Sequence, residues 1–118
     1  MSYDVSLCDP VSGEVLSTDS IHQIQGGTYA LGGTRALELN ITYNYSDHYY
    51  RIFGEEGVRT IYGMSGVDSI PILQEAIAQL GNDVDPNYWA PTEGNAKRAL
   101  IGLLTFAKIR PDGVWKGD

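Results

Sequence analysis

The side chains best suited to chemistry lie in one stretch of the chain, residues 37–54. Amide, hydroxyl and imidazole groups alternate there with apolar residues, and tyrosines and an arginine follow directly. Such groups can hydrogen-bond to a planar or sugar-bearing ligand and stack on it, whereas an exposed strand face more often carries Lys, Glu and Arg. A Tyr-rich strand and helix that pack a core behind a polar exterior would give the same pattern. The ligand-binding hypothesis names Asn40, Thr42, Asn44, His48, Tyr50 and Arg51.

The chain offers little for catalysis. Cys8 could act as a nucleophile with His22 or His48 as its base, but no cation lies next to it to favour the thiolate. The histidines and carboxylates occur at no recognised metal-ligand spacing, and the adjacent Glu55 and Glu56 would point in different directions at a helix end. We therefore expect no catalytic residue, no metal site and no cofactor, and the pattern favours a binding protein over an enzyme.

A strand with one polar face must position these groups. Apolar and polar residues alternate from Leu37 to Tyr45, which predicts a strand because side chains of a strand point to opposite faces in turn. Ser46 or Asp47 can then cap a short aromatic helix near residues 47–53. Gly54 is placed to end that helix in a left-handed conformation.

The residues before this strand predict an N-terminal β-hairpin. Residues 3–7 alternate, residues 9–13 have turn chemistry with Pro and Gly, and residues 14–17 return. The segment Gly26–Thr34 repeats Gly-Gly-Thr, but it lacks the Gly-Lys-Ser/Thr ending of a phosphate loop. We expect these glycines to form turns that lead into the next strand, although paired glycines also allow close approach of a ligand.

Two amphipathic helices follow, at about 69–80 and at 93–109. A Ser65 and Asp68 pair resembles a capping box before the first helix, and Thr92 can cap the second, which Pro111 stops. Residues 114–116 could add a final edge strand. The predicted fold class is α+β, in which a small antiparallel sheet (the N-terminal hairpin plus the Leu37–Tyr45 strand) packs on the two helices.

Length and composition predict a single soluble domain over residues 1–118. The chain is 42% apolar, but no apolar run approaches the ~18 residues that suggest a membrane span. No basic segment followed by an apolar one begins the chain, so no secretory leader is expected, and a single cysteine fits a reducing compartment. These features together favour a cytoplasmic location.

The charge distribution bears on partners. The net charge of −7 disfavours direct nucleic-acid and anionic membrane binding, since phosphate neutralisation needs clustered Lys and Arg. Residues 1–34 contain no Lys or Arg at all, and this acidic segment could engage a basic protein surface. The Tyr-rich strand could equally form a self-association edge, which leaves a homo-oligomer open.

Three motifs resemble a broad set of small proteins from bacteriophages, prophages and gut bacteria. They are the Asn-x-Thr-x-Asn strand at residues 40–44, the Ile-Pro-x-Leu segment within residues 66–73, and the Gly-Asn helix within residues 94–100, the last two with compressed spacing. The resemblance covers about residues 37–110. It implies a phage-borne accessory origin in a host cytoplasm, and it implies no particular activity.

Two functions from different classes are compatible with these observations. The first is a non-catalytic protein that binds a small polar ligand, conceivably a nucleotide signal of host defence that it sequesters. The second is an acidic protein–protein inhibitor of a host protein that binds nucleic acid or acts in defence.

Overall fold

A three-stranded antiparallel sheet forms the centre of the molecule. The computed structural model describes residues 1–28 and 31–118, and the strand order is β4 (Glu38–Thr42), β1 (Ser2–Cys8), β5 (Val114–Gly117). On β1, alternate residues Tyr3, Val5 and Leu7 are buried while Asp4 is exposed. The sheet therefore has one face in the core and one polar outer face, as the period-two pattern requires.

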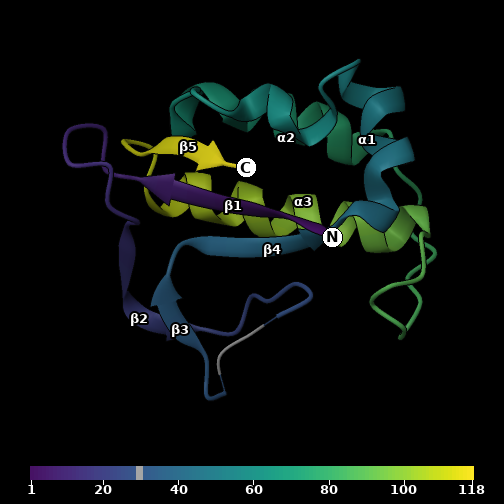
Figure 1. Ribbon diagram of the computed structural model, residues 1–118, viewed down its shortest axis with the longest axis horizontal. Coiled ribbons are helices and arrows are strands. Elements are labelled where there is room, and N and C mark those ends of the chain that lie inside the picture. Colours follow the sequence, from purple (N-terminus) through teal and green to yellow (C-terminus); the bar gives the residue numbers. More distant parts are fainter. Residues whose placement is uncertain (29–30) are drawn as a thin grey trace.

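Two long helices pack against each other on the core side of this sheet. Figure 1 shows α3 (Glu93–Ile109) running behind β1, with α2 (Gly66–Ala78) beside it. Ser65 caps α2 by accepting a hydrogen bond from the N–H of Asp68, and Thr92 caps α3 in the same way. Apolar side chains of the sheet, the helices and the segment after β4 form one hydrophobic cluster. The α+β fold class is confirmed.

The N-terminal hairpin turn forms, but its return arm is short. The Asp9 carboxylate accepts hydrogen bonds from the backbone N–H groups of Val11 and Ser12, which closes the turn. After one bridge between Cys8 and Val15 the chain leaves β1, because β4 and β5 already pair with the two edges of β1.

A separate two-stranded ribbon extends from the sheet. It consists of β2 (Ser17–His22) and β3 (Thr34–Ala36), and in Figure 1 it lies below and to one side of the three-stranded sheet. Residues 29–30 of the Gly26–Thr34 segment fall outside the described residues.

The predicted strand Leu37–Tyr45 ends earlier than expected, at Thr42. The Thr42 hydroxyl accepts a hydrogen bond from the N–H of Asn44, and this starts the 3-10 helix η1 (Tyr43–Tyr45) in place of further strand. Helix α1 (Ser46–Phe53) follows, and the shorter η2 (Gly57–Ile61) packs beside it. The short aromatic helix is therefore confirmed, with Tyr45 and Tyr49 fully buried.

Within the described part of the chain, no helix is both long enough and apolar enough to cross a membrane.

Candidate functional site

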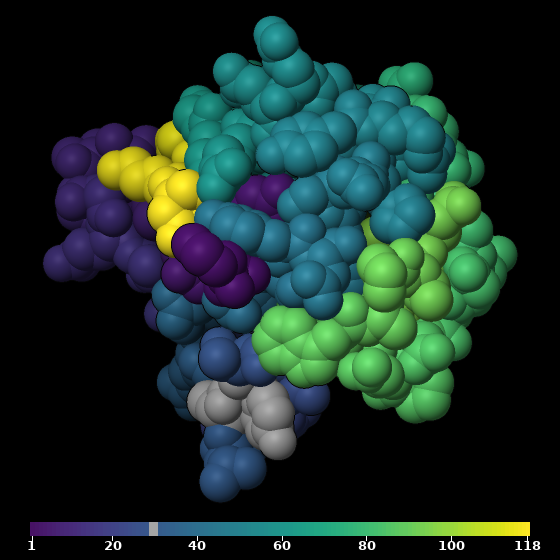
Figure 2. All heavy atoms as spheres, turned by 45° about the vertical axis from the view of Figure 1, so that its right-hand side comes forward, coloured from purple at the N-terminus to yellow at the C-terminus, as the bar shows by residue number. Residues whose placement is uncertain are grey.

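The polar side chains that follow β4 hold a connector, defined as residues 82–91, against the body of the molecule. The Asn44 side-chain amide donates to the backbone oxygen of Trp89 at 2.9 Å. His48 Nε2 lies 2.8 Å from the backbone oxygen of Pro91 and donates to it. Figure 2 shows the connector, in green, directly beside the blue surface of the 43–53 segment. These two predicted ligand-binding side chains are therefore engaged within the chain.

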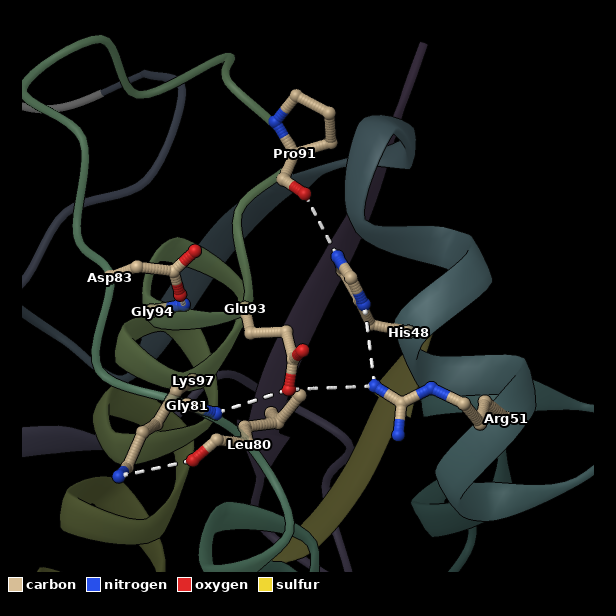
Figure 3. A network of polar contacts seen from close by, with 9 residues as sticks. All are labelled: His48, Arg51, Leu80, Gly81, Asp83, Pro91, Glu93, Gly94 and Lys97. Carbon is tan, nitrogen blue, oxygen red and sulfur yellow. Dashed lines mark hydrogen bonds and ion pairs between the residues drawn. The ribbon is translucent and has the colours of Figure 1, made fainter.

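His48 also belongs to a surface network that joins α1 to the start of α3 (Figure 3). Arg51 lies 3.5 Å from His48 Nδ1 and 3.6 Å from the Glu93 carboxylate, which also accepts from the N–H of Gly81. The guanidinium can only donate, so Nδ1 accepts and Nε2 holds the ring proton. Both ring nitrogens of His48 are thus occupied, which makes a general-base role at this position unfavourable.

Thr42 and Asn40 contact the connector through Tyr88. The Tyr88 hydroxyl accepts a hydrogen bond from the N–H of Thr42 at 2.9 Å and donates to the backbone oxygen of Asn40 at 3.1 Å. Thr42 is only 1% exposed, so its side chain cannot reach a ligand at the surface. Tyr88 therefore closes part of the free edge of β4.

Asn95 is a structural residue that the sequence analysis names only as part of the Gly-Asn motif. It is 2% exposed, its amide donates to the backbone oxygens of Asn87 and Ala90, and its oxygen accepts from the N–H of Asp85. In the sequence, this structural role is indicated by a single Asn beside the apolar face of the predicted 93–109 helix. This side chain fixes the conformation of the connector from the inside.

A short segment, residues 23–27, crosses the free edge of β4, and we call it the strap. The N–H of Gly27 donates to the backbone oxygen of Asn40 at 3.1 Å. A Cβ on Gly26 would lie 1.6 Å from that same oxygen, so only glycine permits this approach. The first glycine pair of the 26–34 segment thus serves close contact between two backbones.

A polar cleft of about 380 Å³ opens between the outer face of the sheet and the strap. Carboxylates come from Asp4 on β1 and Glu38 on β4, with the side chain of Asn40 beside them. His22 closes one end, where its two ring nitrogens bond to the backbone of Ala36 and of the strap. The described residues that line the cleft include no Lys or Arg: Asp4, Val5, Ser6, His22, Gln23, Ile24, Gln25, Thr28, Gly33, Thr34, Glu38, Leu39 and Asn40.

The six predicted ligand-binding residues do not converge on this cleft. Asn40 lines it, where its amide donates to Ser2 Oγ and to the Asp4 carboxylate at 2.6 Å each. Tyr50 is 43% exposed on α1, and its ring packs against Gly57. Thr42, Asn44 and His48 bond to the connector, and Arg51 pairs with Glu93 at the start of α3. Thr42 also accepts a hydrogen bond from Asn44 of η1.

The surroundings of Cys8 disfavour a role for this residue as a nucleophile. This cysteine is buried, and burial raises the pKa of its thiol above the ordinary value, which disfavours the thiolate. Burial likewise raises the pKa of Tyr49 well above the ordinary value, and its hydroxyl donates to the backbone oxygen of Ala96. Among the described residues, no three His, Cys, Asp or Glu side chains gather in a way that could hold a metal ion.

No protein-family model, no curated protein and no solved structure matches this chain. Its function must therefore be argued from its own geometry.

Proposed function

We propose that this protein is a non-catalytic binder of a small polar ligand, held in the polar cleft. The observation that supports this best is the lining of the cleft, which combines two carboxylates with amide and hydroxyl groups. The cavity has a volume of about 380 Å³, and the described residues that line it include no Lys or Arg. A cavity of this size suits a small molecule.

The chemistry of the lining selects the ligand class. The carboxylates of Asp4 and Glu38 can only accept hydrogen bonds when ionised, and Asn40 has its amide nitrogen committed to Ser2 and Asp4. The side-chain oxygens of the sheet face therefore form a surface rich in acceptors. A ligand with several O–H or N–H donors, such as an amine or an amino sugar, complements it.

This chemistry modifies the nucleotide hypothesis from the sequence. The phosphates of a nucleotide would face the carboxylates of Asp4 and Glu38 with no cation from the lining to offset the repulsion. We therefore favour an amine-bearing or hydroxylated ligand over a nucleotide. In a phage-borne setting, such a protein would act by sequestering its ligand from the host.

Native mass spectrometry of protein purified gently from its expression host tests this proposal. We expect a mass excess of about a few hundred daltons per chain over the denatured protein, the mass of a ligand that a cavity of this size accepts. The excess should be lost in the double variant Asp4→Asn, Glu38→Gln, because both charged acceptors are removed. Glu75→Gln is the matched control, since Glu75 is an exposed carboxylate on α2. A mass excess that survives in the double variant would locate the ligand elsewhere and contradict the proposal.

The geometry gives less support to an acidic inhibitor. The N-terminal segment has no cation of its own, but Arg110 lies near it: hydrogen bonds to Asp112 chiefly raise the pKa of this guanidinium, and the charges of Asp9 and Asp19 add to the rise. Lys116 also pairs across the sheet from Ser6, on the outer face. These two cations from the C-terminal part of the chain thus lie near the N-terminal segment and reduce the field that would steer a basic partner.

A further inference from the structure

The strap has a second cavity on its other side, against α3. This α3 cavity has a volume of about 380 Å³ and is distinct from the polar cleft, although both contact the strap and Leu39. Its remaining walls come from α3 and from the aromatic residues Tyr45 and Tyr88. It shares no carboxylate with the polar cleft, because no Asp or Glu is among the described residues that line it.

The floor of the α3 cavity is apolar. A Cβ on Gly102 would lie 3.0 Å from a methyl carbon of Ile24 and 3.3 Å from a methyl carbon of Leu39, so α3 and the strap meet closely at this glycine. Ala99 and Ile101 of α3 continue the apolar lining. A ligand with a hydrocarbon body would therefore replace water over this floor at a gain in free energy.

Four polar side chains around the α3 cavity already have partners, those of Tyr45, Tyr88, Asn95 and Thr105. The Tyr45 hydroxyl donates to the backbone oxygen of Tyr88, and the Thr105 hydroxyl donates to the backbone oxygen of Ile101. Asn95 bonds to the connector through both atoms of its amide group.

Arg98 is different from these groups. Within the described residues the structure gives its guanidinium no ion pair and no hydrogen bond, and it is the only Lys or Arg among the residues described as lining the cavity. Its charge is close enough to the Tyr45 hydroxyl to oppose the rise in the pKa of that group. One unpaired guanidinium thus stands at the edge of an apolar floor.

We infer that the α3 cavity binds a small organic anion, whose apolar body covers Ile24 and Ala99 and whose carboxylate pairs with Arg98. Arginine suits this role because its planar donors match a carboxylate in a bidentate geometry. This site is separate from the proposed polar cleft and takes a ligand of opposite charge.

Phenylacetate and phenylacetamide are a matched pair of probes, because they share a shape and differ in charge. We expect phenylacetate to shift the backbone amide signals of Gly26 and Gly102 in a ¹⁵N-correlation NMR titration, with a dissociation constant of about 1 mM for a fragment of this size. Phenylacetamide should bind about five-fold more weakly, because it loses an ion pair with an exposed arginine.

Four variants separate the contributions. Arg98→Gln should lower the affinity for phenylacetate to that for phenylacetamide, while Lys108→Gln, an exposed cation on the same helix, should leave it unchanged. Ala99→Leu should weaken both probes, since it fills part of the cavity. Glu38→Gln, which lies in the polar cleft alone, should affect neither probe, so a failure of the polar-cleft proposal is distinguishable from a failure here.

Three results would overturn the inference. One is equal binding of the two probes to the unchanged protein, and a second is phenylacetate binding that survives Arg98→Gln at full strength. Shifts that appear only on residues remote from α3 and the strap would count against it in the same way.

Discussion

The backbone N–H of Thr42, at the last position of β4, donates its hydrogen bond to the side-chain hydroxyl of Tyr88 at 2.9 Å. The same hydroxyl donates to the backbone oxygen of Asn40, so one phenol provides both the acceptor and the donor that a neighbouring strand would provide. An unpaired strand edge is a template for unwanted pairing, and here a connector residue covers it.

Tyr88→Phe should therefore destabilise the protein. Thr42 is buried, and the variant leaves its N–H without a partner, which costs about 1–3 kcal/mol of unfolding free energy. Urea unfolding followed by circular dichroism measures this value. Tyr50→Phe, on a half-exposed side chain, is the control and should change stability by less than about 0.5 kcal/mol. Equal stabilities of the two variants would show that the Tyr88 hydroxyl does not close the edge.

Asn95→Ala should loosen the connector more than the rest of the fold. It removes three hydrogen bonds to the backbone of Asp85, Asn87 and Ala90 from a buried position. We expect a loss of about 2 kcal/mol in unfolding free energy, with faster hydrogen exchange in residues 82–91. Val84→Ala, at an exposed position of the connector, should produce neither effect. Unchanged exchange in the Asn95 variant would contradict this role.

The helices could be predicted well because their signals are local. Helix α3 spans residues 93–109 as predicted, since Thr92 caps its first turn. Helix α2 begins at Gly66, three residues before the predicted start, because the Ser65 cap determines the start and Pro71 is accommodated inside the helix. Because Pro71 has no N–H, the carbonyl of Val67 lacks its usual helical donor. Val67 is 55% exposed, so this carbonyl can bond to water instead.

The candidate site could be predicted only in part. The alternation around Asn40 correctly indicated polar side chains on one face of β4, but Asn44 and His48 find their partners more than forty residues away in the connector. No local pattern reports such pairings. The polar cleft likewise arises because the strap, β1 and β4 meet through long-range contacts, so no local pattern at Asp4 or Glu38 indicates that they line one cavity.

The glycine at position 26 should tolerate no side chain. A Cβ there would lie 1.6 Å from the Asn40 backbone oxygen, so Gly26→Ala must displace the strap from β4. We expect a loss of about 1–3 kcal/mol in thermal or urea unfolding, together with changed NMR signals for residues 38–42.

Gly81→Ala is the matched control for this substitution. A Cβ on Gly81 would meet its nearest atom at 3.6 Å, an ordinary contact, and the change should be close to neutral. A Gly26→Ala protein as stable as the Gly81→Ala protein would mean that the strap does not rest on β4.

The buried tyrosines should make the fold sensitive to alkali. Burial raises the pKa of Tyr62 to about 12 and that of Tyr49 well above its ordinary value, whereas in the unfolded chain both ionise near 10. Because the folded state holds these protons more tightly, the stability they contribute is complete below pH 10 and is lost progressively as the pH rises through about 12.

Tyrosinate absorbance and circular dichroism recorded together in a pH titration measure this behaviour. We expect the absorbance of the buried tyrosines to rise with the loss of helical signal. Tyr49→Phe should unfold at a higher pH than the unchanged protein, once the difference between their stabilities at pH 7 is taken into account. The reason is that one buried proton no longer has to be lost. A Tyr49 that ionises near 10 in the folded protein would contradict its burial.

The most direct test of the central claim, that the polar cleft binds a donor-rich ligand, is a pair of NMR titrations with glucosamine and glucose 6-phosphate. Both are derivatives of glucose, but the first carries an ammonium group in place of the 2-hydroxyl and the second carries a phosphate on the 6-hydroxyl. We expect glucosamine to shift the amide signals of Glu38, Asn40 and Gln25, and Glu38→Gln to weaken this binding, while glucose 6-phosphate leaves these signals unchanged. Shifts of these signals by glucose 6-phosphate alone, or by glucosamine equally in the Glu38→Gln variant, would contradict the claim.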